Sequence, residues 1–316
     1  MRSEKKHQMT KGCVNCSSAD ISVVFSSTDY FTKTRYYYHS CENCGLLFID
    51  PLPSRKRLKD IYEFNSIDLE KNANSLLFIF WENKYLRPLF SFFGDRVNSE
   101  RISQINSLIT SKKNRHLLDL GCGTGIFLKK ALQSGWKVSG QEISKASIVQ
   151  AKQRISSDVE ISNNFIEKLQ FPSGVRAITM WHVFEHITEF KKTIKHISSS
   201  MSKGSFLIME TPNAEALSIK MFKSESPMTL VPEHITFWSE DAFRKLLKEH
   251  SFELVSVSYP MTFPFTTTSA AYKHFMRQFN NILALSLLPI YFLYSIFMYT
   301  STPKNNESIR VIAKKI

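Results

Sequence analysis

Hydrophobic and polar positions change period in a regular way along the second half of the chain. Short, nearly continuous apolar runs predict buried strands at 116–120, 137–142, 175–181, 206–210, 253–257 and 308–313. Apolar residues at helical spacing predict helices at 126–133, 144–154, 191–198 and 241–249. Ser144 stands where an N-cap residue is expected. Strands that alternate with helices predict an α/β protein whose parallel sheet is covered on both faces.

The first part of the chain has a different pattern. Residues 1–50 carry short β-like runs, and Pro51 and Pro53 then interrupt the chain. Residues 54–112 are predicted to be helical, with an apolar, aromatic stretch at 76–93. The expected units are a cysteine-containing unit at 1–50, a helical connector at 51–112, an α/β domain formed by 113–260 and 304–316, and an insert at 261–303.

Composition and charge narrow the class of partner. The chain has 316 residues, of which 43% are hydrophobic and 22% charged, as expected for a folded globular protein. Its net charge of +13 favours an anionic partner, either nucleic acid, a phosphorylated substrate or an anionic membrane surface. The start, MRSEKKHQMTKG, has no apolar core. We therefore expect no secretory signal peptide and a cytoplasmic location.

Four of the five cysteines form two pairs with CxxC spacing. Cys13 and Cys16 make the first pair, and Cys41 and Cys44 the second. In a reducing compartment, paired CxxC units indicate zinc more often than disulfides. Four thiolates form a closed structural site with no open coordination position. We therefore expect a zinc ribbon that stabilises a unit too small to have a full core of its own.

A glycine-rich loop follows the first predicted strand of the α/β domain. The sequence is LDLGCGTG, in which Asp119 precedes Gly121, Gly123 and Gly125. A dinucleotide-binding fingerprint requires glycine at position 126, which is isoleucine here. The loop resembles motif I of the class I S-adenosylmethionine-dependent methyltransferases. This resemblance covers residues 113–260 and the final strand, and it implies a Rossmann-like seven-stranded sheet with S-adenosylmethionine as cofactor.

The same resemblance implies a set of cofactor-binding residues. Asp119 is expected to hold the loop and one end of the cofactor, and Glu142, after the next strand, to bind both ribose hydroxyls. Phe165 stands where the family often has an aspartate near the adenine, so backbone and apolar contacts are expected there. The complete expected set is Asp119, Gly121, Cys122, Gly123, Gly125, Glu142, Phe165 and Trp181.

Three histidines follow predicted strands at the edge where open α/β sheets bind ligands. His182, His186 and His234 are therefore candidate catalytic bases, since a histidine with a pKa near neutrality suits removal of a proton. The alternative is that each has only a structural role. The segment around Glu185 and His186 resembles one that quinone-type methyltransferases use for a divalent cation, so a second metal is possible there.

The uncharged run at 282–299, ILALSLLPIYFLYSIFMY, is close in length to the ~20 residues that span a bilayer. In the family that the chain resembles, the last two strands are antiparallel neighbours, so the insert begins and ends on one side of any membrane. We expect it to dip into lipid, lie in the interface or become buried in protein. Pro289 offers a bend, and Lys273, His274, Arg277 and Lys304 flank the run.

These observations predict a methyltransferase at the cytoplasmic face of a membrane, bound peripherally or monotopically. Its expected acceptor is lipid-linked or amphipathic, with a saccharide of a cell-surface glycan pathway as first choice and a quinone-like ring as second. The choice of a saccharide depends on the resemblance of this layout to sugar methyltransferases. One alternative is a ribosomal RNA methyltransferase with an N-terminal zinc ribbon. Another is a membrane adaptor without catalytic activity.

Overall fold

A seven-stranded sheet forms the centre of the protein. The computed structural model describes residues 10–316 except 30, 55–56, 59–60, 62–86, 112, 227, 262–270, 272–273 and 280. The strand order is β10-β11-β8-β7-β4-β5-β6. Strand β11 is antiparallel to the other six, which are parallel to one another. The strands are β4 (His116–Leu120), β5 (Lys137–Gln141), β6 (Ile161–Ser162), β7 (Ala177–Trp181), β8 (Phe206–Pro212), β10 (Phe252–Ser258) and β11 (Ser308–Lys315). The sheet confirms the predicted α/β class.

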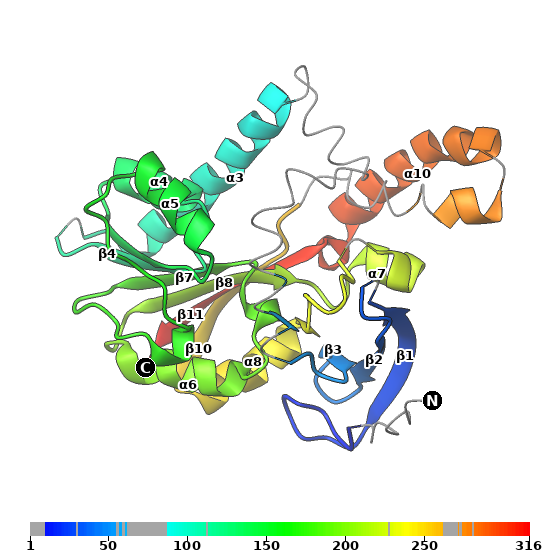
Figure 1. The fold of residues 1–316 in the computed structure, drawn as a ribbon, viewed down its shortest axis with the longest axis horizontal. Helices are drawn as coiled ribbons and strands as arrows, with labels where there is room; N and C mark the ends of the chain where they lie inside the picture. Colours follow the sequence, from blue (N-terminus) through cyan, green and yellow to red (C-terminus); the bar gives the residue numbers. More distant parts are fainter. Residues whose placement is uncertain are drawn as a thin grey trace.

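Helices cover both faces of this sheet (Figure 1). Alternate residues of a strand point to opposite faces, so Leu207 and Met209 of β8 pack in one core and Ile208 in the other. The first core includes α6 (Phe190–Ser200) and α8 (Glu240–Glu249). The second includes α3 (Arg87–Leu108) and α4 (Ile126–Gln133), and α5 (Lys145–Arg154) follows β5.

Several predicted boundaries are confirmed. Strand β4 and helix α4 begin and end where the sequence pattern predicts. The Ser144 side chain accepts a hydrogen bond from the Ser147 N–H, so it caps α5 as expected. Of the predicted apolar stretch at 76–93, residues 76–86 lie outside the described residues, and the remainder belongs to α3.

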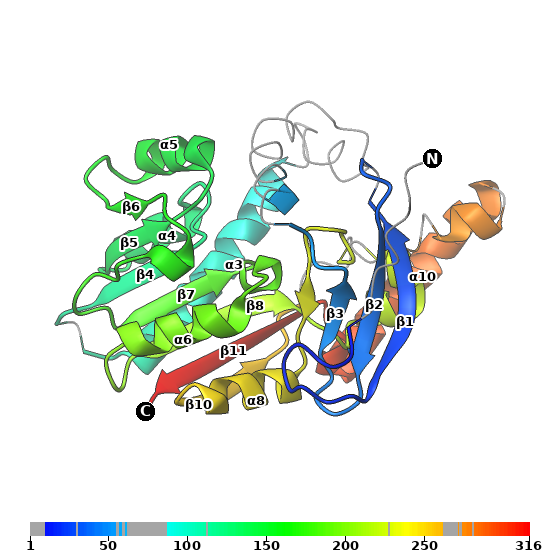
Figure 2. The same cartoon turned by 60° about the horizontal axis from the view of Figure 1, so that its bottom comes forward.

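A second, four-stranded sheet contains the cysteine unit. Its order is β1-β2-β3-β9, with β1 (Ile21–Thr28), β2 (Arg35–Cys41), β3 (Leu47–Asp50) and β9 (Thr236–Phe237). Strand β9 comes from the α/β half of the chain and was not predicted. It pairs with β3, and the two sheets lie side by side in Figure 2. The cysteine unit therefore shares its sheet and part of its core with the rest of the protein.

The insert leaves and rejoins the central sheet at one edge. Strands β10 and β11 are antiparallel, as predicted, and Ser258 lies opposite Arg310. Between them, α10 (Asn281–Ser301) contains Pro289, and α7 (Leu217–Phe222) packs against it. Among the described residues, no helix combines the length and the hydropathy needed to cross a membrane.

Candidate active site

The glycine-rich loop connects β4 to α4 at the carboxyl edge of the sheet. Gly121 has a φ of 69°, a conformation that favours glycine, and a Cβ atom there would lie 2.4 Å from the Val183 side chain. The Gly121 N–H donates to the backbone carbonyl of Gln141 at 2.8 Å, and the Gln141 side-chain oxygen lies 3.2 Å from the same nitrogen. The neighbouring strand β5 therefore fixes the loop. Sequence analysis did not identify this role of Gln141.

Glu142 directly follows β5 and joins two loops. Its Oε2 accepts a hydrogen bond from the Gly123 N–H at 2.9 Å, and its Oε1 accepts one from the Ser144 N–H at 2.8 Å. A carboxylate oxygen has two lone pairs, so each oxygen can accept a further hydrogen bond from a ribose hydroxyl. This position agrees with the expected role of Glu142, which stays a prediction.

Asp119 lies below the loop and not in the cavity beside it. Its Oδ1 accepts a hydrogen bond from the Thr179 hydroxyl at 2.7 Å, and the side chain is buried. Burial disfavours the charged form and raises the pKa of Asp119 to about 7. The Cys122 side chain is buried too, and it packs beside Gly140. Both side chains are buried beside the loop, which agrees with the expectation that Asp119 holds it, and the expected contact of these two residues with the cofactor stays a prediction.

A cavity of about 240 Å³ lies at the carboxyl edge of the sheet beside this loop. It brings together five of the residues singled out from the sequence: Gly121, Glu142, Phe165, His182 and His186. Phe165 is 44% exposed and begins the short 3-10 turn η1 (Ile166–Lys168). The remaining lining residues are Leu58, Gln141, Ile143, Ile166, Glu167, Val183, Ile187 and Thr188. The wall is largely apolar, and its polar side chains are those of Gln141, Glu142, Glu167, His182, His186 and Thr188.

Trp181 does not line this cavity, and its expected place in the cofactor site stays a prediction. Its ring lies 4.3 Å from the Arg101 guanidinium and 5.0 Å from the Phe127 ring. These residues belong to α3 and α4, whose apolar side chains pack in the second core.

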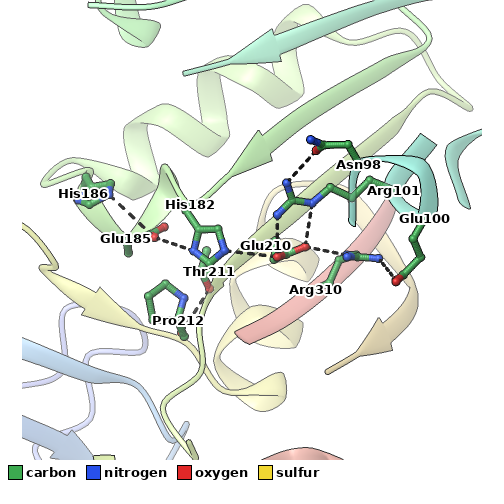
Figure 3. Close-up of polar contacts among 10 residues, drawn as sticks. All are labelled: Asn98, Glu100, Arg101, His182, Glu185, His186, Glu210, Thr211, Pro212 and Arg310. Carbon is green, nitrogen blue, oxygen red and sulfur yellow. Dashed lines mark hydrogen bonds and ion pairs between the residues drawn. The ribbon is translucent and has the colours of Figure 1, made fainter. Parts of the chain in front are cut away.

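His182 lies between two buried carboxylates. Its Nδ1 is 3.4 Å from Oε1 of Glu185, and its Nε2 is 3.3 Å from Oε1 of Glu210 (Figure 3). Burial alone would lower the pKa of His182, but the two carboxylates outweigh it and raise the pKa to about 9. A raised pKa favours the protonated form of the imidazole. The two carboxylates therefore favour a charged His182 that donates to them, and its expected role as a general base stays a prediction.

Glu210 is held in turn by two arginines. Arg101 Nη2 lies 2.8 Å from Glu210 Oε1, and Arg310 Nε lies 2.8 Å from Glu210 Oε2. Arg310 also reaches Glu100 of α3 at 2.9 Å. Burial would raise the pKa of Glu210, but His182 and the two arginines hold it well below its usual range. Sequence analysis missed this network, because its members lie far apart in the chain and carry no local motif.

The other two histidines converge on Glu185. Nδ1 of His186 lies 2.8 Å from the Glu233 carbonyl oxygen, and Nδ1 of His234 lies 2.5 Å from that of Met228. A carbonyl only accepts, so each Nδ1 carries the hydrogen and each Nε2 has the lone pair. Candidate ligand atoms of Glu185, His186 and His234 all lie within 4.8 Å of one another. Burial lowers the pKa of His234 to about 4, which keeps this imidazole neutral.

This cluster has the features of a cation site. The Glu185 side chain is fully buried, and neither of its oxygens has a hydrogen-bond donor in good geometry among the described residues. Metal-ligating histidines usually donate their other N–H to a carbonyl or carboxylate, as His186 and His234 do here. The residues therefore fit a divalent cation with mixed nitrogen and oxygen ligands.

The four paired cysteines also converge. Sγ of Cys13 lies 3.7 Å from that of Cys44, and Sγ of Cys16 lies 3.6 Å from that of Cys41. Tetrahedral zinc with Zn–S bonds of about 2.3 Å requires sulfurs about 3.8 Å apart, so the spacing fits zinc. The Asn15 and Asn43 side chains donate to two of these sulfurs at 3.9 and 3.7 Å. None of the four cysteines forms a disulfide.

The cysteine unit is connected to the cavity by backbone hydrogen bonds. The Ile49 N–H of β3 donates to the Ile235 carbonyl at 3.0 Å, and the Ile235 N–H donates to the Glu185 carbonyl at 2.8 Å. The Ser239 hydroxyl donates to the Cys44 carbonyl at 2.7 Å while it caps α8. Residues 235–239 therefore connect the cysteine unit with Glu185 beside the candidate active site.

Comparison with known proteins identifies the family. Residues 91–257, more than half of the chain, match the family model described as a methyltransferase domain. The chain therefore belongs to this methyltransferase family, and with its glycine-rich loop and sheet order it is a class I S-adenosylmethionine-dependent methyltransferase. This confirms the family resemblance and the fold class that the sequence predicted.

Sequence relatives cover part of the chain. An uncharacterized methyltransferase of Bacillus thuringiensis is 26% identical, over 46% of this chain and 66% of its own length. An uncharacterized protein of Haemophilus influenzae is 30% identical, over 43% of this chain and 52% of its own length. A ubiquinone biosynthesis O-methyltransferase of Coxiella burnetii is 24% identical, over 48% and 72%. This chain thus spans less than two thirds of the first two relatives.

Solved structures share the fold at low identity. Magnesium protoporphyrin IX methyltransferase from Synechocystis PCC 6803 with bound SAH gives a TM-score of 0.51 at 14% identity, covering 83% of this chain and 100% of the other. The [4+2]-cyclase SpnF also gives 0.51 at 14% identity, covering 84% and 98%. A methyltransferase and a cyclase therefore match equally well, so this likeness supports the fold alone.

Proposed function

We propose that the protein transfers a methyl group from S-adenosylmethionine to a hydroxyl of a lipid-linked or amphipathic acceptor at the cytoplasmic face of a membrane. A saccharide carried on lipid is the first choice of acceptor and a quinone-like ring the second. The observation that carries this proposal is the cavity, in which Glu142, His182 and His186 border one largely apolar space beside the glycine-rich loop. Nucleic acid is not the expected acceptor.

Relatives support an oxygen acceptor. The printed name of the Coxiella burnetii relative is ubiquinone biosynthesis O-methyltransferase, and it aligns over 48% of this chain. Methyl transfer to oxygen is an in-line displacement that needs alignment of the two reactants and removal of the hydroxyl proton. Of the three candidate bases, His182 and His186 line the cavity, and an imidazole nitrogen that binds a cation is not available as a base.

Two metal sites belong to this proposal. Cys13, Cys16, Cys41 and Cys44 would hold structural zinc. Glu185, His186 and His234 would hold a divalent cation, which supplies positive charge that favours an ionised acceptor oxygen. His182 bridges Glu185 and Glu210 and so keeps the Glu185 carboxylate in place.

Transfer of radiolabel from S-[methyl-³H]adenosylmethionine tests the acceptor. Purified protein is incubated with detergent-extracted lipids, and label in the organic phase is measured before and after mild acid. Acid-labile label indicates a lipid-linked saccharide, and acid-stable label a quinone-like ring. Glu142→Ala serves as the inactive control. Label only in added ribosomal RNA, or cofactor binding without transfer to any lipid fraction, would overturn the proposal.

A further inference from the structure

Helix α10 turns an apolar face away from the protein. Tyr291, Ser295 and Tyr299 lie on its inner side and are 5%, 0% and 2% exposed. Ile290, Leu293 and Phe297 lie on the opposite side and are 66%, 67% and 63% exposed. We call these three residues the outer face. Surface helices normally have the reverse arrangement, with polar side chains outside, so the outer face requires an explanation.

The outer face is a continuous stripe. Residues three, four and seven positions apart share one side of a helix, and Ile290, Leu293 and Phe297 have these spacings. Tyr294 borders the stripe and is 43% exposed, and its ring lies 6.4 Å from that of Tyr291. An aromatic residue with a polar tip beside an apolar stripe is typical of a helix at a membrane interface.

The segments next to α10 carry mostly positive charge. Residues 254–306 contain no aspartate or glutamate, whereas Lys304 is exposed just after α10. Helix α7 packs against α10 through Phe222, whose ring lies 5.5 Å from that of Tyr291. It brings exposed Lys220, and Lys223 follows it directly. The nearby Glu225 is already occupied by His274 and Arg277. This basic surround is complementary to anionic headgroups.

The position of α10 matches the position of the cavity. Strand β10 ends at Ser258, and β11 begins at Ser308 opposite Pro212, the last residue of β8. Both ends of the insert therefore meet the sheet at the carboxyl edge of the parallel strands, the edge where the cavity lies. Figure 1 shows α10 projecting from this side of the molecule.

We propose that the outer face of α10 lies in the headgroup–acyl boundary of an anionic lipid bilayer, with Lys220, Lys223 and Lys304 at the headgroups. This inference deepens the proposed function, because it supplies the surface from which a lipid-linked acceptor reaches the cavity. A second copy of the chain would bring two basic surrounds together, so the lipid surface is the better match for the charge. The apolar stripe contributes the hydrophobic part of binding and the lysines the electrostatic part.

Flotation with vesicles tests this assignment. The full chain is mixed with vesicles of phosphatidylcholine and phosphatidylglycerol, and the bound fraction is measured after centrifugation. The test variant is Ile290→Gln, Leu293→Gln and Phe297→Gln combined. The matched control is Val24→Gln, Val149→Gln and Val255→Gln combined, which changes three other exposed apolar residues. Calorimetric binding of S-adenosylmethionine confirms that each variant is folded.

We expect the wild type and the control variant to bind the vesicles. We expect the partition coefficient of the outer-face variant to fall by about tenfold or by a larger factor. Replacement of phosphatidylglycerol by phosphatidylcholine should also weaken wild-type binding. Equal flotation of both variants would overturn the inference, as would a dimer in solution that only the outer-face substitutions dissociate. Methylation of lipid extract in detergent is measured in parallel. Transfer without flotation would refute the docking surface alone, and flotation without transfer would refute the proposed acceptor alone.

Discussion

Single residues in this protein matter mainly through the charges and backbone groups that they hold in place. Glu142 accepts hydrogen bonds from the Gly123 and Ser144 N–H groups, so one carboxylate fixes the loops on both sides of the cofactor site. Gln141 fixes the same loop from within the sheet. A substitution at Glu142 is therefore expected to change the geometry of both loops as well as any contact with the ribose.

Replacement of Glu142 by alanine is expected to weaken S-adenosylmethionine binding about 100-fold. Two hydrogen bonds from the ribose to a carboxylate contribute about 1.5 kcal/mol or more each, and tenfold in affinity corresponds to about 1.4 kcal/mol. Isothermal titration calorimetry measures the change. Glu160→Ala, which removes an exposed carboxylate near the same sheet edge, is the control and should keep wild-type affinity. Unchanged affinity in Glu142→Ala would remove this residue from the cofactor site.

The buried carboxyl of Asp119 should make stability depend on pH. Its pKa rises from 3.8 to about 7 on folding because of burial, so the native state binds the proton more tightly. Stability from this group is complete at low pH and is lost as pH rises through the folded pKa. Asp119→Asn should therefore gain stability relative to wild type at pH 8 but not at pH 4. Urea unfolding of the cofactor-free protein checks this, with exposed Asp158→Asn as control.

Loss of the Glu210 carboxylate should destabilise the fold by about 3 to 5 kcal/mol. Glu210→Gln would leave His182, Arg101 and Arg310 without their shared counter-charge in a buried place. Glu240→Gln breaks an exposed pair with Arg244 and should cost less than about 1 kcal/mol. Urea denaturation of the two variants gives the comparison. Similar small losses in both would show that the buried network is dispensable for stability.

At the scale of elements, the cysteine unit is a sheet completed from elsewhere in the chain. Strands β1 to β3 provide three of its strands, and β9 provides the fourth. Cys13, Cys41 and Cys44 share a core cluster with Trp238 and Phe243. The boundary predicted at residue 50 therefore marks a change of sequence pattern more than a separate folding unit.

Removal of zinc should loosen the cysteine unit and destabilise the core that it shares with the central sheet. Cys41→Ser would leave three thiolates, which bind zinc far more weakly than four. The expected outcome is loss of stoichiometric zinc by atomic absorption and new proteolytic cleavage within residues 10–50. Cys122→Ser is the matched control, since Cys122 lies outside the cluster, and it should retain zinc. A zinc content that Cys41→Ser does not alter would exclude the proposed site.

Local patterns predicted the central elements well because their hydrophobic period and caps are short-range signals. Strand β4, helix α4 and the cap at Ser144 are examples. The glycine-rich loop was found because Asp119 and the three glycines that follow it lie close together in the sequence. In contrast, β9 has only two residues and depends on pairing with β3. The Arg101–Glu210–Arg310 network joins α3, β8 and β11, and no local pattern predicts such contacts.

At the scale of the whole molecule, the insert is attached to a sheet that is complete without it. Ser258 and Arg310 lie opposite each other in the β10–β11 pair, so the two ends of the insert are close in space. Beyond the sheet, α10 contacts α7 through Phe222 and Tyr291, and Tyr299 donates a hydrogen bond to Glu307 at 2.8 Å. These contacts lie away from the glycine-rich loop.

Replacement of residues 261–303 by a short glycine–serine linker should therefore leave cofactor binding within about threefold of wild type. The reason is that no residue of the insert is among those that line the cavity in the described structure. Calorimetry with S-adenosylmethionine gives the affinity, and circular dichroism checks the fold. A variant with native-like circular dichroism but no cofactor binding would show that the insert helps to form the active site.

The hydrogen bonds from Ile49 through Ile235 to Glu185 have a thermodynamic consequence. The zinc unit and the cavity share a short segment, so a ligand that orders this segment from one side lowers the entropic cost of ordering it from the other. Linkage is reciprocal. If bound S-adenosylmethionine raises the affinity for zinc by some factor, bound zinc raises the affinity for S-adenosylmethionine by the same factor. The equilibrium affinity for zinc would then depend on cofactor occupancy, and the affinity for the cofactor on zinc occupancy.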